Sequence, residues 1–167
     1  METTRHFTAT TYVVADGAVA LHLHDRIGKW LPPGGHIDRD ELPHEAALRE
    51  IEEETGLDAS IVADRDEIGS PTVEPLPQPH HVQLADVNVY GEEGAPESAV
   101  GHQHVDLVYY AAADSRTIDP ADGEEPAEAW EWFDAEALAN DGERFDPDVA
   151  EIAQLAIATV EERRPSK

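Results

Sequence analysis

The chain has 167 residues, enough for one domain with a sizeable hydrophobic core. It contains no cysteine, which excludes a disulfide framework and thiol chemistry. Asp and Glu total 37 against 11 Lys and Arg, and the resulting net charge of −26 argues against nucleic-acid binding, which needs a basic footprint. We therefore expect a single domain over residues 1–167 with no nucleic-acid partner.

No apolar run approaches the roughly 20 residues that a membrane span needs, and the N-terminal residues lack a signal-peptide pattern. A soluble, cytoplasmic protein with no membrane partner is expected. Acidic residues occur along the whole chain and Lys is scarce, a composition that resembles proteins of extreme halophiles. In molar salt the Debye length falls to about 3 Å, which screens self-repulsion. The alternative is a surface built for a basic partner.

The N-terminal part predicts a β-hairpin. Residues 6–15 form the first expected strand, Asp16-Gly17 the turn, and residues 18–24 the second strand. In the second strand His22 and His24 fall on the same face. This pair could bind a metal, but the favoured interpretation is the polar side of a half-buried strand.

The next stretch predicts a tight loop followed by a helix. Pro32-Pro33 ends a strand, and Gly34-Gly35 permits backbone conformations that other residues resist. Pro43 suits the first turn of a helix and Gly56 suits its end. An apolar side of this helix is expected to pack on the core, and it comprises Leu48, Ile51 and Thr55.

Three carboxylates of this helix, Glu50, Glu53 and Glu54, lie on one arc, because residues three and four apart are surface neighbours. Like charges at this spacing destabilise a helix, so a cation should offset them. Arg49 can act as an internal cation, but a hard divalent ion fits better. Mg²⁺ prefers oxygen ligands and combines one or two carboxylates with water and substrate phosphates.

The complete pattern is Gly35, five residues, Glu41, seven residues, and then residues 49–57, Arg-Glu-Ile-Glu-Glu-Glu-Thr-Gly-Leu. It resembles the Nudix box, with every fixed position filled. The resemblance implies an α/β fold in which a mixed β-sheet is sandwiched between α-helices. It also implies a Nudix pyrophosphohydrolase that cleaves a nucleoside diphosphate linked to another moiety X.

The resemblance also implies roles for the matching residues. The cofactor would be Mg²⁺, with Mn²⁺ as an acceptable substitute. Arg49 would orient Glu50 or Glu53, Glu41 would close the loop onto the helix, and Glu50 would be a third metal ligand or the base that deprotonates water. The candidate metal ligands are Glu50, Glu53, Glu54 and the backbone carbonyl of Gly35.

The partner implied by the resemblance is a small-molecule nucleotide. A nucleoside triphosphate is favoured as substrate, because the chain is short. ADP-ribose, dinucleoside polyphosphates and nucleotide sugars also fit. A non-catalytic nucleotide-sensing domain is the alternative class, whereas an isoprenoid diphosphate isomerase would need a Cys that the chain lacks. The resemblance also allows a homodimer.

After the box, the sequence predicts alternating strands and loops and a final pair of helices. Strands are expected at residues 60–63, 79–90, 103–113 and 128–133. Loops are expected at residues 64–78, 91–101 and 114–126. A short helix is expected at residues 133–138, and a long one begins near Asp146, which can cap it, and Pro147.

Outside the box, a few residues are candidate substrate contacts. His36 adjoins the box, and His104 lies in a His-x-His pair with His102. His80-His81 could lie on a strand that pairs with the one carrying His102 and His104. Four histidines near each other could contact phosphate or bind a soft metal. By resemblance, a Glu before the Trp-rich strand completes the site, and the sequence does not choose among Glu124, Glu125 and Glu128.

Overall fold

The structure, a computed structural model, describes residues 2–90 and 99–164. Its strands are β1 (Thr4–Ala15), β2 (Ala18–Leu23), β3 (Trp30–Leu31), β4 (Gly34–His36), β5 (Ala59–Ile61), β6 (His81–Tyr90), β7 (Ala99–Ala113) and β8 (Trp130–Asp134). Its helices are α1 (Pro43–Thr55), α2 (Ala135–Asn140) and α3 (Pro147–Arg163). A 3-10 turn, η1 (Ala127–Ala129), lies between β7 and β8.

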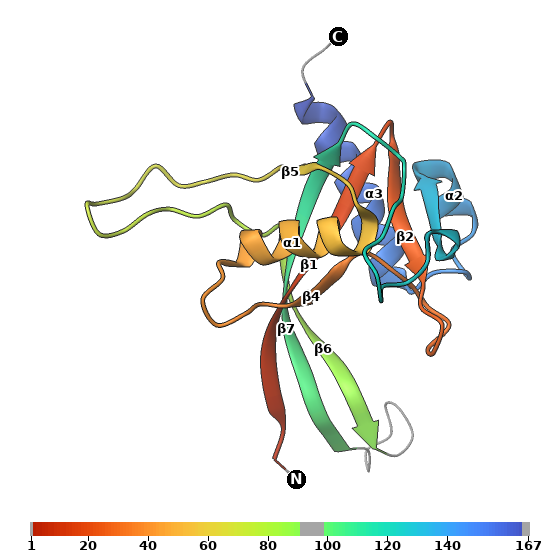
Figure 1. Cartoon of the computed structure of the whole chain (residues 1–167), viewed down its shortest axis with the longest axis horizontal. Helices are drawn as coiled ribbons and strands as arrows, with labels where there is room; N and C mark the ends of the chain where they lie inside the picture. Colours follow the sequence, from red (N-terminus) through yellow and green to blue (C-terminus); the bar gives the residue numbers. More distant parts are fainter. Residues whose placement is uncertain (1, 91–98, 165–167) are drawn as a thin grey trace.

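One mixed sheet holds these strands together. The order is β3-β2-β1-β7-β5, with β4 also paired to β1, β6 to β7 and β8 to β2. β1 and β7 run parallel over a long register, whereas the other pairs are antiparallel. In Figure 1, α1 crosses the sheet, and β1, β6 and β7 extend well beyond the helices toward the N-terminus.

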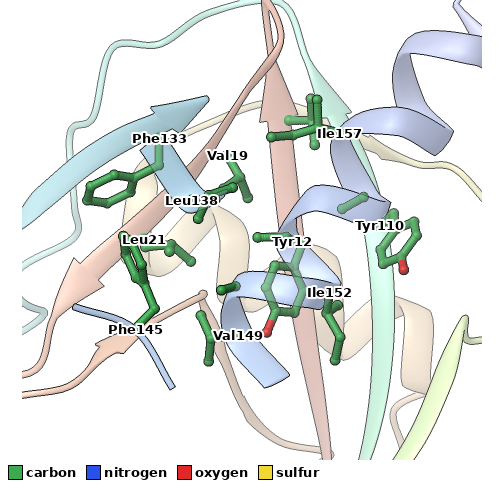
Figure 2. Packing of buried hydrophobic residues seen from close by; sticks show 14 of the residues in the cluster. Tyr12, Val19, Leu21, Tyr110, Phe133, Leu138, Phe145, Val149, Ile152 and Ile157 are labelled. Carbon is green, nitrogen blue, oxygen red and sulfur yellow. The ribbon is translucent and has the colours of Figure 1, made fainter. Parts of the chain in front are cut away.

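Helices cover both faces of the sheet, which confirms the expected α/β class. Alternate residues of β1 point to opposite faces. Val13 and Ala15 pack with Ile51 of α1, while Tyr12 and Val14 belong to the cluster formed with α2 and α3. Figure 2 shows this second cluster, in which α3 lies over β1 and β7. Its labelled members are Tyr12, Val19, Leu21, Tyr110, Phe133, Leu138, Phe145, Val149, Ile152 and Ile157.

The predicted hairpin and box helix are both present. Asp16 and Gly17 have φ of 48° and 74°, the paired positive values of a two-residue hairpin turn. α1 begins at Pro43 and ends at Thr55. Gly56 follows as the left-handed C-cap, with a φ of 68°. The Glu45 carboxylate accepts the Leu42 N–H at 2.9 Å and closes the first turn.

Several predictions of local structure are wrong. Gly34-Gly35, expected to form a tight loop, lies in strand β4 without a positive φ, because this segment pairs with β1. β7 already includes residues 99–101, which were expected to be loop, because β6 is long enough to pair with them; residues 91–98 of that loop lie outside the described part of the chain. Glu128 lies on η1 and not on the Trp-rich strand, since Pro126 starts a helical turn and β8 begins at Trp130.

Two side chains also differ from expectation. Asp146 stands at the N-cap position of α3 without a capping hydrogen bond, because its carboxylate pairs with Lys29 Nζ at 3.0 Å. His22 is not a half-exposed polar residue: it is buried, and its ring lies 4.7 Å from that of Trp130. β2 runs between β1 and β8, and its residues Ala18–His22 are buried on both faces of the sheet.

Candidate active site

The packing of α1 fixes where its carboxylates point. Ala46, Ala47, Ile51 and Thr55 are buried against the sheet. Because these residues recur at helical spacing, they hold the helix in one rotation about its axis. The flanking arc, which carries Glu50, Glu53 and Glu54, therefore faces the glycine loop and the cleft beside it.

Arg49 connects the loop of the box to the helix. Its Nε and Nη2 donate to the two oxygens of Glu41 at 2.8 and 3.1 Å, a bidentate pair. Its Nη1 donates to Glu50 at 2.7 Å and to Glu53 at 3.1 Å. Its Nη2 also donates to the carbonyl of His36 at 3.0 Å. One guanidinium thus joins three carboxylates and the end of β4.

Glu41 holds the loop as well as the arginine. Its carboxylate accepts the backbone N–H of Asp38 at 3.2 Å in addition to the guanidinium bonds. The hydrogen bonds from Arg49 hold the pKa of Glu41 below its usual range, and the carboxylates of Glu41 and Glu50 raise the pKa of Arg49. The pair is charged at any pH at which the protein would work.

The glycine loop lies directly against the carboxylates. β4 pairs with β1, so that Gly35 lies opposite Ala9. A Cβ on Gly35 would collide with the Glu50 carboxylate, so a larger residue at this position would displace that side chain. The N–H of Gly34 donates to Glu54 at 3.2 Å.

The acidic loop before η1 docks on the C-terminal end of α1. The N–H of Ala121 donates to the carbonyl of Glu53 at 2.8 Å, and that of Asp119 donates to the carbonyl of Thr55 at 2.9 Å. These bonds satisfy carbonyls that the helix end leaves unpaired. They bring Glu124 and Glu125 to the cleft that Glu54 lines. Glu128 is absent from the described lining of that cleft.

Two cavities meet at the glycine loop. The first, about 660 Å³, is lined by Glu54, Glu124 and Glu125, together with the β2–β3 loop. The second, about 680 Å³, lies over Thr8, Asp106 and His104 of β1 and β7. Both are within the usual size for small-molecule sites. His24, Arg26, Leu31 and Gly34 line both cavities.

Glu54 is partly buried, and two other carboxylates lie near it. Burial raises the pKa of Glu54 to about 8, and the nearby charges of Glu50 and Glu124 act in the same direction. Arg49 contacts Glu50 and Glu53, but among the described ion pairs none involves Glu54 or Glu124. The site therefore has an unbalanced negative charge and an excess of hard oxygen donors.

This donor set fits a hard divalent cation. Carboxylate oxygens from Glu50, Glu53, Glu54 and Glu124 are the ligand type that Mg²⁺ and Mn²⁺ prefer. A bound cation would reverse the conditions that raise the pKa of Glu54, since an opposite charge stabilises the ionised carboxylate. The residues present thus fit the expected cofactor.

The histidine predictions have mixed outcomes. His104 lines the second cavity, and its contact with substrate stays a prediction. His36 instead joins His6, His102 and His104 in a cluster beside it. The expected grouping with His80-His81 is wrong, because His81 pairs with Val108 while His104 pairs with Ala85, several residues further along the strands.

Sequence reasoning missed Arg26 and Asp106. Arg26 is the only cation among the described residues that line both cavities, and Asp106 accepts hydrogen bonds from Thr8 at 2.8 Å and Thr10 at 2.9 Å. An isolated Arg in a strongly acidic chain was the available signal for the first. The second needed the parallel register of β1 and β7, which no local pattern reveals.

Comparison with known proteins agrees with this geometry. The RNA pyrophosphohydrolase of Erythrobacter litoralis is 29% identical over 112 residues, 67% of this chain and 63% of that protein. The asymmetrical bis(5'-nucleosyl)-tetraphosphatase of Rattus norvegicus is 52% identical over 40 residues, 24% of this chain and 27% of that protein. The matches thus span less than two thirds of either relative's length.

Structural similarity extends further. A NUDIX family hydrolase from Clostridium perfringens has a TM-score of 0.77 and 30% identity, covering 94% of this chain and 99% of that one. A UDP-X diphosphatase shares the fold, with a TM-score of 0.54 and 19% identity over 98% of this chain and 66% of that one. The profile of the NUDIX domain matches residues 5–154, so the chain belongs to the Nudix hydrolase family.

Proposed function

We propose that the protein hydrolyses a pyrophosphate linkage in a nucleoside diphosphate linked to X, with a divalent cation as cofactor. The observation that carries this proposal is the proximity of Glu54 to Glu50 and Glu124 beside the glycine loop, with Glu53 joined to Glu50 through the Arg49 guanidinium. Glu50, Glu53 and Glu54 come from one helix, and Glu124 comes from a loop far along the chain. Such a site can hold the cation that a charge-dense diphosphate requires.

The protein residues then have distinct roles. A bound Mg²⁺ or Mn²⁺ would neutralise phosphate charge and lower the pKa of an attacking water. Glu53 and Glu54 are the first-choice ligands, and Glu50 is a third ligand or the base. Arg49 and Glu41 are positioning residues, because they fix the carboxylates through charge-assisted hydrogen bonds. Among the three later glutamates, Glu124 is the favoured ligand, since its charge acts on Glu54.

The second cavity is the proposed site for the nucleoside part of the substrate. It combines apolar walls, including Ile27, Leu31 and Val87, with acceptors on Asp106. Arg26 lies where the two cavities meet and is suited to a phosphate contact. In the first cavity, Glu125 lies close to His24 and Asp25. A nucleoside triphosphate occupies this arrangement with its base in the second cavity and its phosphates at the carboxylates.

A dinucleoside polyphosphate is the second candidate. Two cavities of similar size flank Gly34 and Leu31, so each could take one nucleoside. The rat relative that is 52% identical over 40 residues carries the name of a tetraphosphatase acting on such compounds. ADP-ribose fits the same two cavities with its ribose in place of the second nucleoside.

A panel assay separates these substrates. Triphosphates, ADP-ribose and diadenosine tetraphosphate would be incubated with the protein and Mg²⁺ in molar KCl, and products resolved by chromatography. Release of a monophosphate and diphosphate from one triphosphate supports the first candidate. Cleavage of the tetraphosphate alone supports the second. Tight nucleotide binding without any product would instead support a nucleotide-sensing domain.

Several broader expectations stay predictions: a single domain, a cytoplasmic location and a homodimer. In the part of the chain that the structure describes, the helices are all too short or too polar to cross a membrane. Adaptation to high salt is proposed from the net charge of −26. A thermal midpoint that does not rise with KCl concentration would contradict it.

A further inference from the structure

Four histidines gather beside the second cavity, on strands that are distant in sequence. The parallel register places His6 of β1 opposite His104 of β7, and His102 lies two residues earlier on the same face. The antiparallel register of β4 places His36 opposite Thr8, two residues after His6. Imidazoles from the three strands β1, β4 and β7 thus lie close together.

The separations among these rings suit a metal. A ligand nitrogen from each of His6, His36 and His102 lies within 4.8 Å of the others. His6 Nδ1 and His36 Nε2 are 3.4 Å apart. Two nitrogens bound at about 2.0–2.1 Å to a tetrahedral zinc are separated by about 3.3 Å, so this pair already has the required spacing. The ring centroid of His104 is 4.9 Å from that of His36 and 5.0 Å from that of His102.

We propose that His6, His36 and His102 bind a borderline divalent transition metal such as Zn²⁺, with His104 flanking the fourth position. Imidazole nitrogens prefer such metals, whereas the carboxylates of α1 suit Mg²⁺. The two sites therefore differ in ligand chemistry. This inference does not depend on the proposed hydrolysis.

The surroundings favour cation capture. Zinc binds the neutral imidazole, whose unprotonated ring nitrogen supplies the ligand atom. His6 and His36 are exposed, so an ion can reach them from solvent. The net charge of −26 also attracts cations to the surface.

The metal would link the starts of β1 and β7 to the end of β4, next to the carboxylate site. His6 lies near the start of β1, His102 near the start of β7, and His36 ends β4. The carbonyl of His36 accepts a hydrogen bond from Arg49 Nη2 at 3.0 Å. A metal on the His36 ring would therefore hold the backbone that Arg49 contacts, and it would add a further link among β1, β4 and β7.

Zinc titration of the full-length protein tests the proposal. Isothermal titration calorimetry would be performed in molar KCl with excess Mg²⁺, which occupies the carboxylate site. The variants are His6→Gln and His102→Gln. His24→Gln is the matched control, because His24 belongs to a different His-Asp-Glu group, with Asp25 and Glu125. Glu53→Gln controls for binding at the catalytic carboxylates. Co²⁺ absorption provides a second readout of nitrogen coordination.

We expect one equivalent of Zn²⁺ to bind, with a Kd at least about tenfold weaker in His6→Gln and His102→Gln and unchanged in both controls. The thermal midpoint of the wild type should rise with Zn²⁺, because a ligand that binds only the folded state stabilises it. Absence of saturable binding, equal binding by His6→Gln, or loss of binding in His24→Gln or Glu53→Gln would overturn the proposal. Thermal scans without metal show whether each variant is folded.

Discussion

The backbone N–H of Ala121 donates to the carbonyl of Glu53 at 2.8 Å. This bond joins the acidic loop to the helix that carries the box carboxylates. Together with the bond from Asp119 to Thr55, it fixes the loop just before Glu124 reaches the cleft. The proposed cation site is thus assembled from two distant segments through main-chain contacts.

Gly56 controls this docking. Its φ is +68°, and an added Cβ would collide with the Asp119 carbonyl. We expect Gly56→Ala to lower the free energy of unfolding by about 1–2 kcal/mol through backbone strain, with a further loss of activity as the loop shifts. Gly142→Ala is the control, since it has open space and no positive φ. Chemical denaturation and turnover measure both effects, and equal stability of the two variants would contradict the expectation.

Arg49 should not tolerate replacement by lysine. A single ammonium cannot reproduce the fork that contacts Glu41, Glu50 and Glu53. We expect Arg49→Lys to lower kcat about 10–100-fold, as losses of groups that orient metal ligands do. Steady-state kinetics with saturating Mg²⁺ provide the measurement. Arg39→Lys, at an exposed loop position, is the comparison, and similar kcat values for both variants would argue against the orienting role.

The choice among the later glutamates can be tested with neutral isosteres. Glu124→Gln should weaken Mn²⁺ binding by about tenfold, because affinity follows the number of charged ligands. Glu128→Gln should leave it unchanged, since Glu128 lies on η1 away from the described cleft lining. Mn²⁺ titration followed by electron paramagnetic resonance reports the affinity. Weaker Mn²⁺ binding by Glu128→Gln, together with unchanged Mn²⁺ binding by Glu124→Gln, would reverse the assignment.

The raised pKa of Glu54 predicts a pH dependence of stability. Between pH 4.5, the ordinary pKa of a Glu side chain, and pH 8, near the pKa of about 8 that Glu54 has in the folded protein, Glu54 binds more protons in the folded state than in the unfolded state. The free energy of unfolding of the metal-free protein should therefore fall as pH rises through this window. Glu54→Gln removes the titrating group, so its slope should be smaller than that of the wild type.

Denaturation of both proteins at several pH values, with chelator and molar KCl, measures the two slopes. Carboxylates distant from Glu54 contribute equally to each slope, so the difference reports Glu54 together with its coupling to Glu50 and Glu124. Parallel slopes would contradict a raised pKa. Saturating Mg²⁺ should flatten the slope of the wild type, because it stabilises the ionised carboxylate.

Local patterns in the sequence were sufficient for the elements and for the box itself. The limits of α1 follow from Pro43 and Gly56, and the hairpin follows from Asp16-Gly17, because these residues carry their own backbone preferences. The resemblance predicts the contact of Arg49 with Glu50 or Glu53 and a link from Glu41 to the helix, but not the direct pair of Arg49 with Glu41.

Features that depend on long-range register could not be predicted. The cluster of His6, His36 and His102 requires both the parallel pairing of β1 with β7 and the pairing of β4 with β1. The burial of His22 follows from β8 joining the edge of β2, which alternation along β2 alone cannot reveal. Glu124 could not be chosen because its position is set by the docking of residues 119–121 on α1.

The most direct measurement is Mg²⁺-dependent turnover of the wild type, Glu53→Gln and Glu52→Gln on the substrate that the panel identifies. Glu52 is adjacent on α1 but exposed and outside the carboxylate group, so its variant controls for charge and helix context. We predict that Glu53→Gln loses about a hundredfold or more in kcat while Glu52→Gln keeps near-normal turnover. Equal activity of all three proteins, or turnover that persists without a divalent cation, would contradict catalysis at these carboxylates.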